Sequence, residues 1–266
     1  MRTSWFKLLA GMAVAIGLAA SVVPVAQAQT AITVGSDTTF PPFEWQKDGE
    51  IFGFDIDMIR AIGKAEGLEV TIKPMPFAGI VPSLQAGSID VAVAGMTITK
   101  ARMDNVNFSH AYYRSGLSVL VRADESDIQG FDDLKGRVVA TKKATSSVDY
   151  MMKNGIPVGS IKQFKDISSA YEALINRGAD AVIFDHPVNI DFTNQSDKAK
   201  IVGELLTGEY YGIAVSKSKA DLVEKMNSGL QKIKASGEYE QLFDKYFGGD
   251  KRGMIEGTEN PADVAL

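Results

Sequence analysis

The chain has 266 residues, with 28 Lys and Arg, 33 Asp and Glu, two His and no Cys. The formal net charge of −5 disfavours nucleic acid as a partner, because phosphate backbones are bound by clustered basic side chains. The absence of cysteine excludes disulfides, thiolate nucleophiles, cysteine-ligated metals and a lipid anchor on cysteine. The hydrophobic content of 45% suits a folded protein of one large or two smaller domains.

The first 28 residues have the pattern of a secretory signal peptide. The basic residues Arg2 and Lys7 precede an apolar stretch that ends in Ala-Gln-Ala at 26–28. An uncleaved membrane anchor is the alternative, but glycines and a proline interrupt the short apolar stretch. We therefore expect residues 1–28 to be removed. The remaining chain is expected to be free in a bacterial periplasm, without a lipid anchor.

Strand and helix patterns alternate along the first part of the chain that follows. Strand patterns lie at 31–36, 68–74 and 89–95, and helix patterns lie at 54–67 and 79–87. The apolar residues of 54–67 recur at the spacing of an amphipathic helix. This β-α-β-α-β order predicts a mainly parallel sheet with right-handed crossovers.

The same rhythm repeats after Gly130. Strand patterns at 136–143, 160–164 and 179–185 alternate with helix patterns at 146–155, 168–178 and 186–195. The repetition predicts a second α/β lobe.

The lobes are expected to be joined by two extended crossing stretches, 115–123 and 210–217. The helices that follow have no sheet of their own, so the simplest topology returns the chain to the first lobe. Lobe 1 is then discontinuous, and hinge closure around a ligand in the cleft suits two crossing strands. The resulting boundaries are 29–114 and 212–248 for lobe 1, 115–211 for lobe 2, and 249–266 for a loose C-terminal tail.

A guanidinium just beyond a predicted strand indicates an anion site. The segment 95–102 reads GMTITKAR, and Thr99 is a good N-cap for a helix whose first turn contains Arg102. Ligands of open α/β sheets bind beyond the carboxyl ends of strands, and helix N–H groups beside a guanidinium suit a carboxylate. The alternative is that Arg102 pairs with a surface acid, and the local pattern does not separate the two.

Carboxylates also follow strands of both predicted lobes. Asp37 and Asp185 each end a predicted strand, where each could hold an ammonium or amide donor or could serve a turn or helix cap. Asp55 and Asp57 instead open a predicted helix. For these two, capping and interaction with the helix dipole are the preferred interpretation.

Loop aromatics and a lysine are further candidates. Phe40, Trp45 and Phe77 lie in segments rich in Pro and Gly, where they could wall a pocket or fill the core beneath a loop, the second especially for Trp45. Lys142 ends a strand of the second lobe, and Ser146 opens the next helix. This pattern fits a second polar site or an ordinary N-cap beside an exposed lysine.

The sequence gives little support for catalysis or metal binding. The only histidines are His110 and His186, and the second precedes a proline at a predicted helix start. No HExxH, GxSxG, Walker or GxGxxG motif is present. We expect a protein that is not an enzyme and that needs neither a metal nor a cofactor.

Several ordered motifs together resemble the bacterial extracellular solute-binding proteins of family 3, which serve ABC importers of polar amino acids. The motifs are SDTTFPPFEW…GFDIDMIRAI, KPMPFAGIVPSLQAGSIDVAVAGMTIT…R, FSHAYYRSGL, DLKGRVVATKKATSSVDY and RGADAVIFD. They cover nearly the whole chain after residue 28, and the likeness is greatest to the glutamine binders. The resemblance implies a two-lobed type II periplasmic-binding-protein fold. Each lobe would be a mainly parallel sheet flanked by helices, and a two-strand hinge would join them.

The resemblance also implies how the backbone groups of an amino-acid ligand are held. Arg102 would bind the α-carboxylate, helped by the backbone N–H groups of Thr97 and Ser146. Asp185, the carbonyl of Gly95 and the hydroxyl of Thr97 would take the α-ammonium.

For the ligand side chain, the resemblance implies four further contacts. Phe40 and Phe77 would enclose the aliphatic stem. Asp37 and Lys142 would read an amide, which offers both a donor and an acceptor. Asp37 would disfavour glutamate and Lys142 would disfavour arginine or lysine, since an unpaired buried polar group costs about 1–3 kcal/mol.

The implied function is the binding component of an ABC importer, a monomer that takes a polar L-amino acid, with glutamine favoured, to an inner-membrane permease. Two departures leave the exact ligand open: Phe184 replaces a histidine of the glutamine binders, and Ala144 replaces a frequent glycine. A basic or acidic amino acid is one alternative. Others are a cyclohexadienyl or arogenate dehydratase on the same fold, with Asp37 or Asp185 as general acid, and a sensor module without transport.

Overall fold

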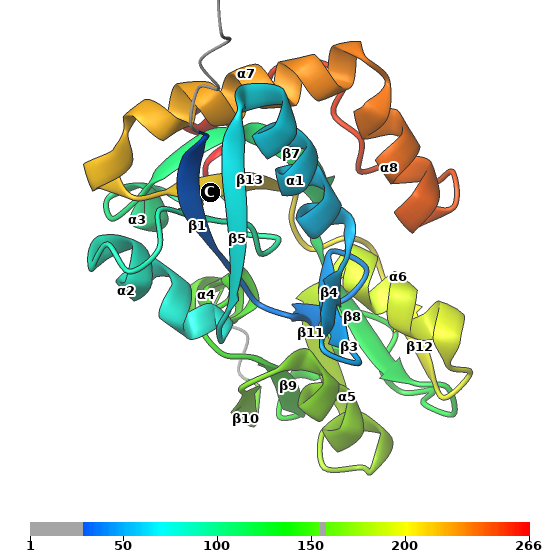
Figure 1. Ribbon diagram of the computed structural model, residues 1–266. Coiled ribbons are helices and arrows are strands. Elements are labelled where there is room, and N and C mark those ends of the chain that lie inside the picture. The colour runs from blue at the N-terminus through cyan, green and yellow to red at the C-terminus, as the bar shows by residue number, and fades with distance from the viewer. Residues whose placement is uncertain (1–28, 155–157) are drawn as a thin grey trace, which may run out of the picture.

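The computed structural model describes residues 29–154 and 158–266, so the signal peptide predicted over 1–28 lies outside the described residues. The described chain forms two α/β lobes, each built on a five-stranded sheet, and one small three-stranded sheet (Figure 1). No helix in these two ranges is long and apolar enough to cross a membrane.

The first sheet has the strand order β5-β1-β6-β13-β7. Its strands are β1 (Thr30–Ser36), β5 (Leu68–Pro74), β6 (Val91–Ala92), β7 (Asn107–Ser115) and β13 (Glu209–Val215). Strand β1 pairs in parallel with β5 and β6, whereas β13 pairs antiparallel with β6 and β7. Only β13 therefore runs against the other strands.

The second sheet repeats this plan in the order β10-β9-β11-β8-β12. Its strands are β8 (Leu117–Arg122), β9 (Val138–Lys142), β10 (Ser160–Phe164), β11 (Ala181–Asp185) and β12 (Ala199–Val202). Strand β9 pairs in parallel with β10 and β11, and β8 pairs antiparallel with β11 and β12. The reversed strands of the two sheets, β8 and β13, are those that follow a crossing between lobes.

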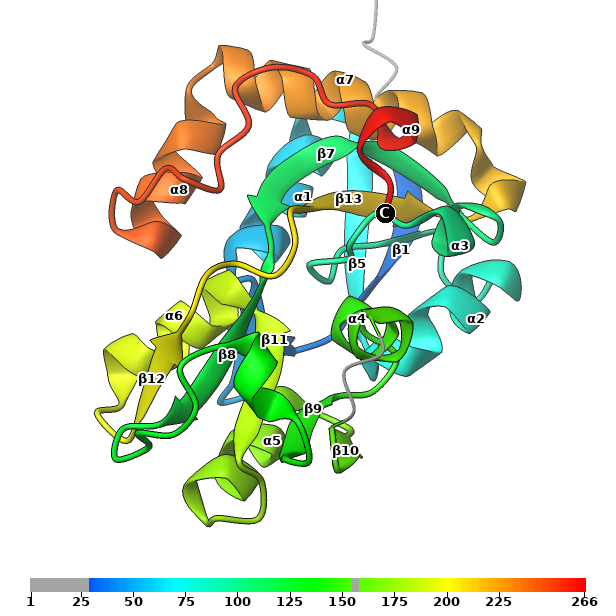
Figure 2. The same ribbon diagram turned by 180° about the vertical axis from the view of Figure 1, so that it is seen from behind.

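The two crossings run side by side (Figure 2). The first is Gly116, between β7 and β8, and the second is 203–208, between β12 and β13. The N–H of Leu206 donates to the carbonyl oxygen of Leu117 at 2.8 Å, and the N–H of Leu117 donates to Oγ1 of Thr207 at 3.0 Å. The predicted crossing stretches 115–123 and 210–217 are thus mostly strands of the two sheets, and the crossings themselves are shorter.

Amphipathic helices cover the first sheet. They are α1 (Phe54–Glu66), α2 (Ile80–Gln85), α7 (Asp221–Ala235) and α8 (Glu238–Phe247). A 3-10 turn at Phe77–Gly79 and the short helix α3 (Lys100–Met103) lie in connections between strands. Helix α7 packs on α1 and β7 through a buried stripe that includes Met226 and Leu230. The terminal helices therefore return to the first lobe (Figure 1).

The second lobe carries α4 (Ser146–Asn154), α5 (Ile167–Ile175) and α6 (His186–Gln195). The small sheet of β2 (Thr39–Phe40), β3 (Glu44–Lys47) and β4 (Glu50–Phe52) belongs to the β1–α1 connection. Trp45 packs there against Phe52 and Tyr246, with ring centroids 6.0 and 6.1 Å away. It is a packing residue, as preferred from the sequence.

The expectation of a loose tail at 249–266 is wrong. The carbonyl oxygens of Gly253 and Glu259 accept N–H groups of Arg114 and Ala111 on the edge strand β7 at 2.8 and 2.9 Å. Ile255 is buried, and a short helix, α9 (Pro261–Val264), follows (Figure 2). The tail covers backbone groups that an edge strand would otherwise expose, and this order depends on tertiary contacts that the tail sequence does not reveal.

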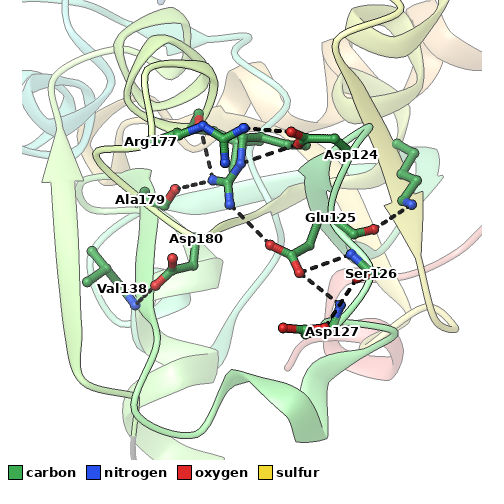
Figure 3. A network of polar contacts seen from close by, with 11 residues as sticks. Asp124, Glu125, Ser126, Asp127, Val138, Arg177, Ala179 and Asp180 are labelled. Atoms are coloured by element: carbon green, nitrogen blue, oxygen red, sulfur yellow. Dashed lines mark hydrogen bonds and ion pairs between the residues drawn. The ribbon is translucent and has the colours of Figure 1, made fainter.

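An ion network fixes one end of the second sheet (Figure 3). The guanidinium of Arg122 donates to the carbonyl of Ala179 at 2.8 Å and to Glu125 at 3.1 Å. Arg177 donates to Asp124 at 2.6 Å. Ala179 precedes β11, whose opposite end carries Asp185, so this network stabilises the lobe at a distance from the candidate site.

Candidate ligand-binding site

The residues predicted from the sequence meet in one small cavity between the lobes. They lie at the carboxyl ends of the parallel strands β1, β5, β6, β9 and β11 or in the segments that follow them. The cavity is lined by Phe40, Phe77, Ala94, Gly95, Thr97, Arg102, Lys142, Thr145, Ser146, Phe184 and Asp185. The ninth predicted residue, Asp37, joins the site through its ion pair with Lys142.

Arg102 is half-buried and contacts both lobes. Its Nη1 donates to the carbonyl of Thr97 at 2.7 Å, and its Nη2 reaches the carbonyl of Ala144 in the other lobe at 3.2 Å. Thr99 caps α3 as predicted, accepting the N–H of Arg102 at 3.2 Å. Burial lowers the pKa of Arg102, while the charge of Glu209 opposes that effect. No acid in the described residues forms an ion pair with this guanidinium, so the surface-pair alternative is not observed.

Ala144 takes the left-handed backbone conformation, with φ of 64°. Glycine enters this region without penalty, whereas alanine does not. Ala144 therefore holds this conformation at a cost in backbone strain. The loop matters because its carbonyl is the partner of Arg102 across the cleft.

Asp185 ends β11 and is 4% exposed. It accepts a short hydrogen bond from the hydroxyl of Tyr211, which also bonds Oγ of Ser115 at 2.8 Å. Burial, and then the charge of Glu209, raises the pKa of Asp185 to about 7. A cation bound beside Asp185 would stabilise its ionised form, so the position suits an ammonium group.

Glu209 is a buried carboxylate that the sequence reasoning missed. Its Oε2 accepts the hydroxyls of Thr97 at 2.7 Å and Ser146 at 3.0 Å, and its Oε1 accepts that of Thr207 at 3.2 Å. Burial raises the pKa of Glu209, whereas these hydrogen bonds lower it. The available signal was a charged residue at the start of the apolar and aromatic strand segment EYYGIAV.

Asp37 and Lys142 form a buried ion pair between the lobes. Thr39 donates its hydroxyl to Asp37 at 2.7 Å. Nζ of Lys142 lies 5.6 Å from the ring centroids of both Phe40 and Phe77. The predicted alternative of an exposed lysine is wrong, because Lys142 is 1% exposed.

The aromatic wall depends on a glycine. Gly95 has φ of 50°, and a Cβ there would lie 2.2 Å from the Phe40 ring. Phe184 meets Phe40 edge to face, with ring centroids 5.7 Å apart. Phe184 therefore contributes an apolar wall at the position where the resemblance led us to expect a histidine. The Phe77 ring lies 5.3 Å from the Arg102 guanidinium carbon.

The interpretation of Asp55 as a helix cap is wrong. Its Oδ2 accepts the N–H of Gly95 at 2.9 Å and the hydroxyl of Tyr112 at 2.7 Å, and α1 has no side-chain cap. Burial raises the pKa of Asp55 to about 6, and burial followed by the charge of Asp55 raises that of Glu44. Asp55 thus holds the N–H of Gly95, a residue that lines the cavity. Asp57 instead bonds Lys245 of α8 at 2.7 Å.

The histidines lie away from this cavity. His110 is on β7, where its N–H donates to Asn227 at 2.7 Å, and His186 opens α6 as predicted. Across 29–154 and 158–266, no three His, Cys, Asp or Glu side chains are grouped as metal ligands. Arg102, Lys142 and Asp185 line the cavity, and the carboxylates of Asp37 and Glu209 are bonded to lining residues. This mixture of charges suits a small zwitterion.

Residues 32–249 match the model of the bacterial extracellular solute-binding proteins, family 3. The chain belongs to this family. The relatives named below are amino-acid-binding proteins and not enzymes, which agrees with the expectation drawn from the sequence.

Two curated relatives and one solved protein illustrate the similarity. The L-cystine-binding protein TcyJ of Escherichia coli (strain K12) is 28% identical over 91% of this chain and 92% of its own. The ABC transporter glutamine-binding protein GlnH of Bacillus subtilis (strain 168) is 34% identical over 80% of this chain and 79% of its own. An ancestral arginine-binding protein of known structure is 39% identical, and the match covers 84% of this chain and 100% of that protein's chain. Its TM-score is 0.79 with arginine bound and 0.77 with glutamine bound. The fold is thus the expected type II periplasmic-binding-protein fold.

Proposed function

We propose that this protein is the periplasmic binding component of an ABC importer for a polar amino acid, and that glutamine is its ligand. The observation that carries the proposal is the convergence in one cavity of Arg102 and Asp185 with the Asp37–Lys142 pair, beside aromatic walls. The protein would act as a monomer, exported by its signal peptide, and would pass the ligand to an inner-membrane permease. The names of the relatives, which bind cystine, glutamine or arginine, support the amino-acid class.

The α-carboxylate of the ligand would bind the guanidinium of Arg102, and its α-ammonium would bind the carboxylate of Asp185. The guanidinium of Arg102 bonds only backbone carbonyls, so it can turn its fork to a carboxylate. Asp185 is buried beside Glu209 without a cation in contact, so an ammonium would stabilise its ionised form. Thr97, Ser146 and the Gly95 carbonyl line the space between these two charges.

An amide would fit between Asp37 and Lys142. The carboxylate can accept the amide N–H, and the ammonium can donate to the amide oxygen. The ion pair now observed between them would open to admit the ligand, so a side chain that satisfies only one partner would leave the other unpaired and buried. Phe40 and Phe77 lie beside Lys142 and would flank the ligand stem.

Arginine is the second candidate, and the charge balance of the cavity favours it. When all are ionised, Asp37, Asp185 and Glu209 give three negative charges, against two positive charges on Arg102 and Lys142. A cationic ligand would neutralise the excess. The buried ammonium of Lys142 argues against it, because a second cation in the same low-dielectric space is repelled.

Calorimetric titration of the refolded, ligand-stripped protein with each of the twenty amino acids tests the proposal. We expect sub-micromolar binding of glutamine and at least tenfold weaker binding of glutamate, arginine, lysine and histidine. Lys142→Met should weaken the binding of glutamine, because it removes the donor to the amide oxygen. It should strengthen the binding of arginine, because it removes the charge that repels a cation. Tightest binding of arginine by the wild type would reassign the ligand, and no binding tighter than about 1 mM would refute the amino-acid class.

Closure by hinge motion belongs to the same proposal. The two crossings at Gly116 and 203–208 are the only covalent links between the sheets in the described chain. The cross-cleft contacts of Arg102 with Ala144 and of Lys142 with Asp37 are those of a closed arrangement. Small-angle scattering should show a smaller radius of gyration with glutamine than without it.

A further inference from the structure

We propose that Glu209 is a positioning residue for the α-ammonium subsite. It orients the hydroxyl protons of Thr97 and Ser146, one from each lobe, so that the Thr97 oxygen faces the ligand only as a hydrogen-bond acceptor. This inference rests on the proposed function, because it takes the ligand to be an amino acid. Glu209 would not contact the ligand itself, but would contact Thr97 and Ser146, which do.

The geometry places Glu209 where both lobes and a crossing meet. It is the first residue of β13, directly after the second crossing, and it pairs with Ser115, the last residue before the first crossing. The side chain is fully buried. Its Oε2 lies 2.7 Å from Oγ1 of Thr97 and 3.0 Å from Oγ of Ser146, and these two hydroxyl oxygens are 3.5 Å apart.

The direction of these hydrogen bonds follows from the chemistry of the groups. An ionised carboxylate only accepts, so both hydroxyls must donate to it. A hydroxyl has a single proton, and once Thr97 has given that proton to Glu209 its lone pairs alone remain for a ligand. An ammonium has only donors to offer, so the oriented Thr97 oxygen is matched to it and mismatched to a carbonyl or carboxylate.

Glu209 also makes the subsite dependent on closure. Thr97 follows β6 in the first lobe and Ser146 opens α4 in the second, so both can reach one carboxylate oxygen only when the lobes meet. The third partner, Thr207, lies on the crossing itself and accepts the N–H of Leu117 at 3.0 Å. Glu209 therefore links the crossing strands to the ammonium subsite in the closed state.

A double-mutant cycle of Glu209→Gln and Thr97→Val tests this role by calorimetric titration with glutamine. If Glu209 acts through Thr97, either single change weakens binding about 10- to 100-fold, and the double variant is no weaker than the weaker single variant. The loss should lie in faster dissociation, measured by stopped-flow fluorescence, because the network exists only in the closed state. Glu204→Gln, an exposed change on the same crossing, is the matched control and should bind like the wild type.

The outcomes separate this inference from the proposed function. Effects of the two changes that multiply, or binding by Glu209→Gln within threefold of the wild type, would overturn the role of Glu209 and leave amino-acid binding intact. Failure of the wild type to bind any amino acid would overturn the proposed function and this inference together. Thermal unfolding of each ligand-free variant shows whether it is folded. If Glu209→Gln is not folded, Glu209→Asp, whose shorter side chain draws the carboxylate away from Thr97, takes its place in the cycle.

Discussion

Replacing Asp185 with asparagine should stabilise the ligand-free protein at neutral and alkaline pH while abolishing ligand binding. The carboxylate is 4% exposed, and burial together with the charge of Glu209 raises its pKa from an ordinary value of 3.8 to about 7. The folded state therefore holds a proton that the unfolded chain releases. This contribution to stability is present below pH 4 and is lost as the pH rises to 7.

The size of the effect follows from linkage. A difference of about 3 pH units corresponds to about 4 kcal/mol above pH 7. Opening of the ligand-free lobes hydrates the carboxylate and recovers part of that cost, so we expect Asp185→Asn to gain about 1–3 kcal/mol at pH 8. The asparagine oxygen can still accept the hydroxyl of Tyr211.

Urea unfolding followed by circular dichroism at pH 5 and pH 8 measures this gain. The variant should be more stable than the wild type at pH 8, and the difference should shrink at pH 5. Asp180→Asn, just before β11 at its other end, is the control. Its carboxylate accepts the N–H of Val138 at 2.8 Å, so this change should give no gain in stability at pH 8. Equal stability of wild type and Asp185→Asn at both pH values would refute the reasoning.

Three further changes test other parts of the structure. Deleting residues 251–266 should lower the free energy of unfolding by at least about 2 kcal/mol, from loss of the buried Ile255 alone, as measured by urea unfolding. Ala144→Gly should raise the thermal midpoint slightly by relieving a left-handed backbone, and a lower midpoint would contradict the assigned conformation. Gly116→Ala should be destabilising or should shift the crossing, because its Cβ would lie 2.3 Å from the carbonyl oxygen of Thr207; unchanged stability and affinity would argue against close packing there.

The alternation of strands and helices could be predicted because each element carries its own periodicity. The site could be predicted in large part for a related reason. Lys142 and Asp185 end strands and Asp37 and Arg102 come after strands, and parallel strands bring their carboxyl ends to one edge. The family resemblance then added the expected role of each residue, which the local pattern left open.

The remaining features depend on partners far away in the chain. Asp55 has the local pattern of a helix cap, but its partners Gly95 and Tyr112 lie 40 and 57 residues away. Glu209 is bonded to Thr97 and Ser146, which lie 112 and 63 residues away. Local patterns carry no record of such contacts, so buried charges of this kind become visible only when the lobes are assembled.

The tail shows the same limit in another form. Its sequence has no long apolar stripe, and its order comes from the edge of β7 and from the loop before α3. The carbonyl of Leu266 accepts the N–H of Lys100 at 3.0 Å, and its N–H donates to the carbonyl of Ile98 at 3.2 Å. The last residues thus support the loop that carries Arg102.

A crystal structure with glutamine bound would show directly how the cavity is used. We predict the α-carboxylate on the Arg102 guanidinium, the α-ammonium on Asp185 and Thr97, and the amide between Asp37 and Lys142, with their ion pair opened. Glutamine bound in another hollow of the protein, or in this cavity with its ammonium away from Asp185, would contradict the assignment.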